Sequence, residues 1–187
     1  MDHYIEFALR PDPEFVPHQL MAALYAKLHR ALVVAGHGRI GVSFPDVNES
    51  ERRLGDRLRL HASQPDLLAL MQAGWLGGMH DHVDCIGPSR VPPQAQHRNV
   101  RRVQTDSNPE RLRRRLIRRH QIDADAARER IPDSAGAFLK LPFLQMHSGS
   151  TGLRFRLFIE HGALQQTPSA GTFSTYGLSP ITTVPWF

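Results

Sequence analysis

The alternation of apolar and polar residues predicts four strands and two helices in the first half of the chain. Ile5, Phe7 and Leu9 alternate with polar neighbours across residues 4–10, as in a half-buried strand. An apolar stripe at helical spacing then runs through residues 17–35, and two nearby glycines suit a helix C-cap. The same reasoning predicts strands at 39–44 and 54–62, a helix at 63–73 capped by Ser63, and a fourth strand at 79–86.

This order of elements predicts the fold class. Strand, helix, strand, strand, helix, strand is the order of the ferredoxin-like split βαβ fold. A proline-rich segment follows at residues 87–96 and is predicted to be a linker. We therefore expect an α+β protein with two domains. Residues 1–94 would form an N-terminal ferredoxin-like (βαββαβ) domain, and residues 95–187 a smaller C-terminal α+β domain.

The second half is predicted to contain extended segments around two helices. A basic extended segment spans residues 97–105, and a short helix spans residues 123–130. Further strands are expected at residues 144–151, 153–159 and 172–178. Between the first two elements lies a helix at about residues 108–120, which carries most of the positive charge.

This arginine-rich helix has two chemically different faces. Ser107 and Glu110 have the spacing of a capping box, and Pro109 suits the first turn. Wound at about 100° per residue, the helix gathers its leucines and isoleucine on one side. Arg113 falls within that apolar arc and is expected to be structural. The opposite side carries five arginines: Arg111, Arg114, Arg115, Arg118 and Arg119.

The uniform charge of that face favours a nucleic-acid partner. Like charges three and four residues apart repel by a few tenths of a kcal/mol per pair, so such a face is costly for stability alone. Arginine is suited to planar, bidentate contact with phosphates and guanine edges. A solvated helix face is the usual explanation of a charge run. Here residues 97–120 hold nine arginines against two acidic residues, a net charge of +7, whereas the whole chain has a net charge of +5. The positive charge is therefore concentrated in this segment and is not a general property of the surface.

Other features of the composition exclude several classes of site. The single cysteine, Cys85, excludes an intramolecular disulfide and a zinc finger, and it is expected in the core. His80 and His82 would share a strand face, but spacing supplies no third ligand, so we predict no metal site and no cofactor. The sequence shows neither a secretory leader nor a membrane-spanning stretch, so a cytoplasmic location is expected.

Four segments carry a resemblance to a known family: RIGVSFP at 39–45, SNPERLRRR at 107–115, RFRLFI at 154–159 and YGLS at 176–179. Over essentially its whole length the chain resembles the CRISPR repeat-RNA processing endoribonucleases of type I-F (Yersinia-subtype) systems. The resemblance implies an enzyme that binds the CRISPR repeat stem-loop and cuts precursor crRNA at the 3′ base of the stem. Attack by the 2′-OH, without metal, would leave a 2′,3′-cyclic phosphate and a 5′-OH.

The resemblance also implies partners and site residues. The enzyme would stay bound to the mature crRNA and join other Cas proteins in a surveillance complex. The family's histidine falls on His29, its serine on Ser148 and its assisting tyrosine on Tyr176. The residues expected to read or stack on bases are Arg102, Gln104 and Phe155.

These implied roles agree with the chemistry, although composition and spacing alone single out none of the eleven histidines. Imidazole ionises near neutral pH, so His29 suits removal of a proton from the 2′-OH. Ser148 is expected to hold the ribose in line for attack, and Tyr176 to orient the imidazole.

Two other functions stay open at the level of sequence. One is an RNA-hairpin-binding module on the same scaffold that does not cleave. The other is a DNA-binding regulator that reads a major groove with the arginine-rich helix. Because fold alone does not fix function, they are separated by experiment: only the endoribonuclease requires a 2′-OH.

Overall fold

A computed structural model describes residues 1–104, 109–132, 139–149 and 152–187. Contacts between residues group the chain into two compact units. The first contains residues 1–102 and 141–187, and the second contains residues 103–140. Within the described ranges, no helix has both the length and the apolar character that crossing a membrane requires.

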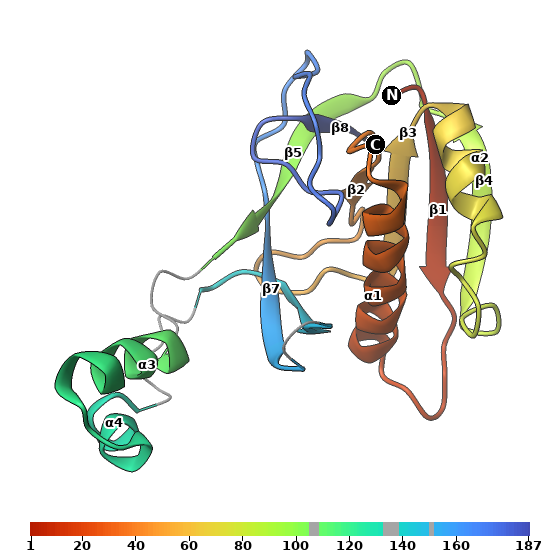
Figure 1. Ribbon diagram of the computed structural model, residues 1–187. Coiled ribbons are helices and arrows are strands. Elements are labelled where there is room, and N and C mark those ends of the chain that lie inside the picture. The colour runs from red at the N-terminus through yellow and green to blue at the C-terminus, as the bar shows by residue number, and fades with distance from the viewer. Residues whose placement is uncertain (105–108, 133–138, 150–151) are drawn as a thin grey trace. The chain divides into compact units, whose positions relative to one another are not determined.

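The first sheet has the predicted ferredoxin-like topology. Its elements, in chain order, are β1 (His3–Leu9), α1 (Pro17–Ala35), β2 (Gly41–Ser43), β3 (Arg57–Ala62), α2 (Gln64–Gln72) and β4 (Val83–Arg90). The strands lie in the order β2-β3-β1-β4, and each neighbouring pair is antiparallel. Helices α1 and α2 cover one face of the sheet (Figure 1). The predicted α+β class is confirmed.

Apolar residues from the central strands meet the helix stripe in the core. Ile5 pairs with Leu60 and Phe7 with Leu58 across β1 and β3, and all four side chains are buried. Gly36 ends α1 in the left-handed conformation, with φ of 67°, and its N–H donates to the Leu32 carbonyl. The helix therefore begins and ends at the predicted residues.

The second sheet is built from the remaining strands and shares the same core. Its strands are β5 (Gln96–Val103), β6 (Phe143–His147), β7 (Arg154–His161) and β8 (Thr183–Trp186), in the order β6-β7-β5-β8. Val100, Leu157 and Val184 from this sheet belong to one buried cluster with Ile5 and Leu28. The first compact unit is thus organised around a single hydrophobic core.

The second unit contains a pair of short helices, α3 (Pro109–His120) and α4 (Ala124–Arg130), which pack against each other. Asp123 caps α4 by accepting a hydrogen bond from the Ala126 N–H. Arg113 is buried, and its Nε donates to the Ile131 carbonyl at 2.7 Å. This confirms the structural role expected for Arg113. The predicted cap of α3 at Ser107 lies outside the described residues.

One prediction about the C-terminal strands was wrong, and one strand was missed. Residues 172–178 form a loop and not a strand. Their backbone hydrogen bonds either close turns within the loop or reach single residues earlier in the chain, so they do not form the ladder of a strand pair. The last strand is β8, which sequence patterning missed. β8 contains Pro185, which lacks an N–H, and proline is tolerated because β8 lies at the edge of its sheet.

The fourth strand also differs from its prediction. β4 starts at Val83 and continues through Arg90, so the expected linker at residues 87–96 is shortened at both ends. Cys85 is exposed on this edge strand and is not a core residue. The predicted domain division between residues 94 and 95 separates the two sheets, but the compact units divide the chain at other points.

Candidate active site and nucleic-acid interface

The candidate site is organised around His29, a half-buried residue on α1. Its Nδ1 lies 2.8 Å from the backbone carbonyl oxygen of Thr175. Its ring stacks on the ring of Tyr176, with centroids 4.0 Å apart and planes 2° from parallel. Two predicted site residues separated by almost the whole chain are therefore in direct contact.

The hydrogen bond to Thr175 determines where the neutral imidazole carries its proton. A carbonyl oxygen can only accept, so Nδ1 is the donor and holds the hydrogen. In the neutral ring, Nε2 of His29 then carries the lone pair. The contact leaves Nε2 able to accept a proton from a substrate hydroxyl group. Once protonated, the ring keeps its Nδ1–H bond to the same carbonyl.

The loop that orients His29 is itself fixed by the core. The hydroxyl of Tyr25 donates to the Tyr176 carbonyl at 2.6 Å. Tyr25 is fully buried, and burial raises its pKa well above the usual value, so it stays a neutral donor. Gly177 adopts a φ of 68°, and a Cβ there would clash with Val42. Val42 N–H also donates to the Gly177 carbonyl. Hydrogen bonds from Tyr25 and Val42 to two successive carbonyls therefore fix the backbone at Tyr176.

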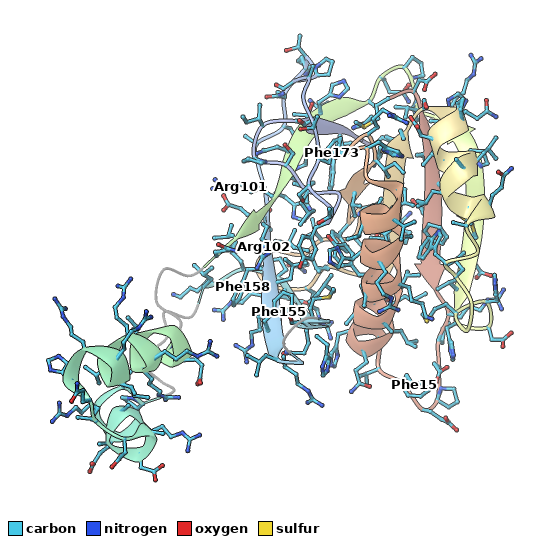
Figure 2. All side chains as sticks on the ribbon, in the orientation of Figure 1. Phe15, Arg101, Arg102, Phe155, Phe158 and Phe173 are labelled. Atoms are coloured by element: carbon cyan, nitrogen blue, oxygen red, sulfur yellow. The ribbon has the colours of Figure 1, made fainter. Side chains whose placement is uncertain are left out.

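A predicted base-reading arginine extends this stack. The Cζ of Arg102, on β5, lies 5.3 Å from the ring centroid of Tyr176 and 5.7 Å from that of Phe155 on β7. Figure 2 labels Arg102 and Phe155 on the neighbouring strands. The His29 ring covers one face of the same tyrosine, so Tyr176 contacts both predicted site residues. The guanidinium is exposed to solvent yet held between two aromatic rings.

The remaining predicted site residues are Ser148 and Gln104. Ser148 follows β6, a strand that packs against α1, and is half-buried. Its N–H donates to the Leu153 carbonyl, and its carbonyl accepts from the Gly152 N–H. A direct approach of Ser148 to His29 stays a prediction. Gln104 is exposed just beyond β5 and belongs to the second compact unit.

The second unit carries the arginine face expected from the sequence. Leu112, Leu116 and Ile117 are half-buried on α3, consistent with the apolar face predicted for this helix. Arg111 also lies within the helix. Four arginine side chains of the predicted face are exposed: Arg114, Arg115, Arg118 and Arg119. A surface with this charge attracts polyanions at a distance and binds phosphate at contact.

Two groups important to the site were missed by sequence reasoning. Tyr25 lies one turn before His29 within the apolar stripe, and a tyrosine among leucines does signal a hydroxyl that needs a buried partner. The carbonyl of Thr175 gives no signal, because every residue has a backbone carbonyl.

Across the described part of the chain, no group of three or more histidine, cysteine, aspartate or glutamate residues is placed to hold a metal ion. His82, one of the two histidines considered in the sequence, has its Nδ1 2.8 Å from the Asp12 carboxylate. That the reaction needs no metal stays a prediction.

Comparisons with known proteins identify close relatives. A family model of CRISPR-associated proteins, Cas_Csy4, matches residues 4–187. The CRISPR-associated endonuclease Cas6/Csy4 of Pseudomonas aeruginosa (strain UCBPP-PA14) is 57% identical over 187 residues, the full length of both chains. The protein of the same name from Escherichia coli (strain UTI89 / UPEC) is 48% identical, again over the full length of both. A solved RAMP protein described as binding different RNA substrates covers 98% of this chain at 11% identity, but its TM-score of 0.30 is too low to support an argument.

Proposed function

The chain belongs to the Csy4 family of CRISPR-associated proteins, and we propose that it is an endoribonuclease that processes CRISPR precursor transcripts. Full-length relatives named CRISPR-associated endonucleases support the activity. The observation that carries the proposal is the His29 ring, which donates from Nδ1 to the Thr175 carbonyl and stacks on Tyr176. This contact is suited to a general base.

In the proposed reaction the RNA supplies the nucleophile. His29 Nε2 removes the proton from a 2′-OH as the 2′-oxygen attacks the adjacent phosphorus. The bond from phosphorus to the 5′-oxygen breaks, and that oxygen takes up a proton. The products are a 2′,3′-cyclic phosphate on the upstream RNA and a 5′-OH on the downstream RNA. Because no protein nucleophile or redox step is involved, imidazole chemistry and positioning are the contributions required of the protein.

Positioning falls to the groups around His29. The stacked Tyr176 ring and the Thr175 carbonyl hold the imidazole in one plane and one tautomer. Ser148 is proposed to hold the ribose so that the 2′-oxygen, phosphorus and 5′-oxygen lie in line. Since misplacement of a reacting group by about 1 Å can cost about a hundredfold in rate, such supports are as important as the base.

Recognition of the RNA is proposed to use two kinds of contact. Arg102 and Gln104 read guanine and adenine edges at the base of the repeat stem, and Phe155 stacks on a base. The exposed arginines of α3 bind stem phosphates, which gives affinity with steep salt dependence. The major groove of A-form RNA is deep and narrow, but it opens near the end of a short stem. A hairpin is therefore a better ligand for the arginine helix than a long duplex.

The proposed cut lies at the 3′ base of the stem, so the recognised stem stays with the upstream product. The enzyme would then remain bound to the mature crRNA, because cleavage removes none of the stem contacts. Retention of this product brings the protein into a complex with other Cas proteins that use the crRNA as a guide. Such assembly is part of the proposal.

The experiment is cleavage of the host's own repeat RNA in EDTA, followed by identification of both new ends by mass spectrometry. We expect a cyclic phosphate and a 5′-OH, with a rate unchanged by added magnesium. A 3′-OH and 5′-phosphate pair, or a requirement for the metal, would contradict the mechanism. Tight binding with no cleavage would leave a hairpin-binding module. Equal affinity for duplex DNA would favour the regulator.

A further inference from the structure

A small pocket lies beside the candidate site at the C-terminal end of α1. It is lined by Leu32, Gly36, His37, Gly38, Ile40, Thr172, Phe173, Ser174 and Thr175, all within the first compact unit. Its volume is about 250 Å³. This is below the roughly 300–1,000 Å³ of sites for drug-sized ligands, so the pocket suits a single flat group.

The pocket and the catalytic base share a structural element. Thr175 lines the pocket, and its carbonyl oxygen is the acceptor for Nδ1 of His29. Leu32, another lining residue, lies three residues after His29 on α1 and so follows it by about one helical turn. Anything bound in the pocket therefore lies against the segment that orients the imidazole.

The walls of the pocket combine an apolar surface with a polar edge. Leu32, Ile40 and Phe173 supply the apolar part, and Phe173 is labelled in Figure 2. His37 and Ser174 supply polar groups at the edge. None of the lining residues is lysine, arginine, aspartate or glutamate. A phosphate would require cationic partners, whereas a neutral heteroaromatic ring matches both the apolar walls and the polar edge.

The polar edge is held in a fixed orientation. Nδ1 of His37 accepts a hydrogen bond from the Arg39 backbone N–H at 3.1 Å, so the neutral ring carries its hydrogen on Nε2. The Asp66 carboxylate lies 4.0 Å from that Nε2 and is itself bound by the Arg39 side chain. Hydrogen bonds from Arg39 and Ser63 lower the pKa of Asp66 to about 2, so the carboxylate remains charged. The neutral His37 ring at the edge of the pocket is thus held in one tautomer, with its Nε2–H on the side of Asp66.

We propose that this pocket binds the nucleobase immediately downstream of the scissile phosphate, on the side of the leaving 5′-oxygen. The inference rests on the proposed function. Arg102, one of the proposed stem-reading residues, lies over the Tyr176 ring on which His29 stacks. In this proposal the strand that leaves the stem passes Arg102 and then His29, and the next base reaches the pocket at Thr175, which lines the pocket and contacts His29. Beyond the stem the RNA is single-stranded, and unstacked bases are the ones that proteins take into pockets.

Binding of that base has a consequence for catalysis. A base seated against residues 172–175 fixes the loop whose carbonyl orients His29, and it also pulls the leaving oxygen into line with the attacking one. The pocket therefore acts on the rate of cleavage more than on affinity, because the stem contacts that give affinity lie elsewhere. The presence of a base on the nucleotide after the cut therefore affects the rate of cleavage.

The first test uses RNA that lacks only the base of the downstream nucleotide. We expect the abasic RNA to bind as tightly as unmodified RNA and to be cleaved roughly tenfold more slowly in a single turnover, because the leaving group is less well aligned.

Thr172 is exposed, so Thr172→Trp can fill the pocket without disturbing the core. This substitution should slow cleavage of unmodified RNA about as much as removal of the base does. It should not slow cleavage of the abasic RNA any further. Thr172→Val and the exposed-loop variant Thr167→Trp are the matched controls. Equal rates on the two RNAs, or additive effects of Thr172→Trp and base removal, would overturn the proposal.

A second test does not depend on cleavage. 2-Aminopurine is placed at the downstream position of an RNA whose attacking 2′-OH is replaced by hydrogen. In complex with the natural protein, the fluorophore should be shielded from quenching by acrylamide, and Thr172→Trp should abolish the shielding. If unmodified RNA is not cleaved, the proposed function fails, yet shielding would still identify the pocket as a base site. Unshielded fluorophore in the natural complex would contradict the pocket assignment.

Discussion

The arginine helix and the histidine site differ in how the chain builds them. The exposed arginines of α3 lie within one short helix, so local spacing alone creates the surface. His29, Tyr176 and Arg102 come from three distant parts of the chain and meet only after folding. The helix is suited to bind any phosphate backbone, whereas the histidine site demands a particular geometry. A substitution in the histidine site should therefore lower the rate of cleavage, whereas a substitution in the arginine helix should lower the affinity for RNA.

The largest expected effect is on cleavage when His29 is replaced. General acid–base catalysis contributes typically about 10²–10⁴-fold, so His29→Ala should slow single-turnover cleavage by at least that order. Affinity for the stem-loop should stay within a few-fold, because the arginine surface is intact. His18→Ala, at an exposed position in the first turn of the same helix, is the control. A large loss of affinity in His29→Ala would instead make His29 a binding residue.

The converse experiment removes charge from α3. Replacing Arg115 and Arg119 together by alanine should weaken binding at least tenfold and reduce the slope of log K against log salt by roughly 1.5, if each contacts one phosphate. The rate of cleavage at saturating protein should change little. The matched variant Arg115→Lys with Arg119→Lys keeps the charge and should keep the slope, although planar bidentate contacts are lost. An unchanged slope in the alanine pair would mean that these arginines do not face phosphates.

Acid should weaken the unit that contains the histidine site. Burial, with a further contribution from Arg98, lowers the pKa of His161 to about 3, and burial also lowers the pKa of His61. In the unfolded chain such groups bind protons near pH 6.5, so the folded state is fully favoured above that pH and loses stability as pH falls toward 3. For His161 alone the loss at pH 5 is about 2 kcal/mol.

The measurement is chemical denaturation of the protein and of His161→Phe at pH 7 and pH 5. The natural protein should lose more stability between the two pH values than the variant, because phenylalanine has no proton to bind. His18→Phe, at an exposed position, should behave like the natural protein. Identical losses in all three proteins would show that the burial of His161 is not the cause.

The smallest expected effect concerns Tyr176 and separates its ring from its hydroxyl. The contact with His29 is a parallel stack of rings, so Tyr176→Phe should keep the cleavage rate within a few-fold, while Tyr176→Leu should slow it by about tenfold through loss of orientation. Single-turnover rates at saturating protein make the comparison. A loss in Tyr176→Phe as large as in Tyr176→Leu would show that the hydroxyl, and not the stack, is the important group.

The contrast between the two regions also explains what the sequence could predict. Periodicity predicted α1 with its residue boundaries, the order of elements in the first sheet, and α3 with Arg113 turned inward. It failed at β8, where a proline in an edge strand hides the pattern, and at residues 172–178, whose backbone bonds are made by turns. The roles of His29 and Tyr176 came from a family resemblance, because no local pattern encodes a contact between distant segments. Tyr25 and the Thr175 carbonyl required the structure.

The most direct test of this division between binding and chemistry uses a single atom of the RNA. Two repeat stem-loops are compared in EDTA, one all-ribose and the other with a 2′-deoxy nucleotide just upstream of the expected cut. Because the proposed base acts on the 2′-OH and the arginine helix acts on phosphates, both RNAs should bind with equal affinity and only the first should be cleaved. Cleavage of the deoxy RNA, or a marked loss of its affinity, would contradict the account.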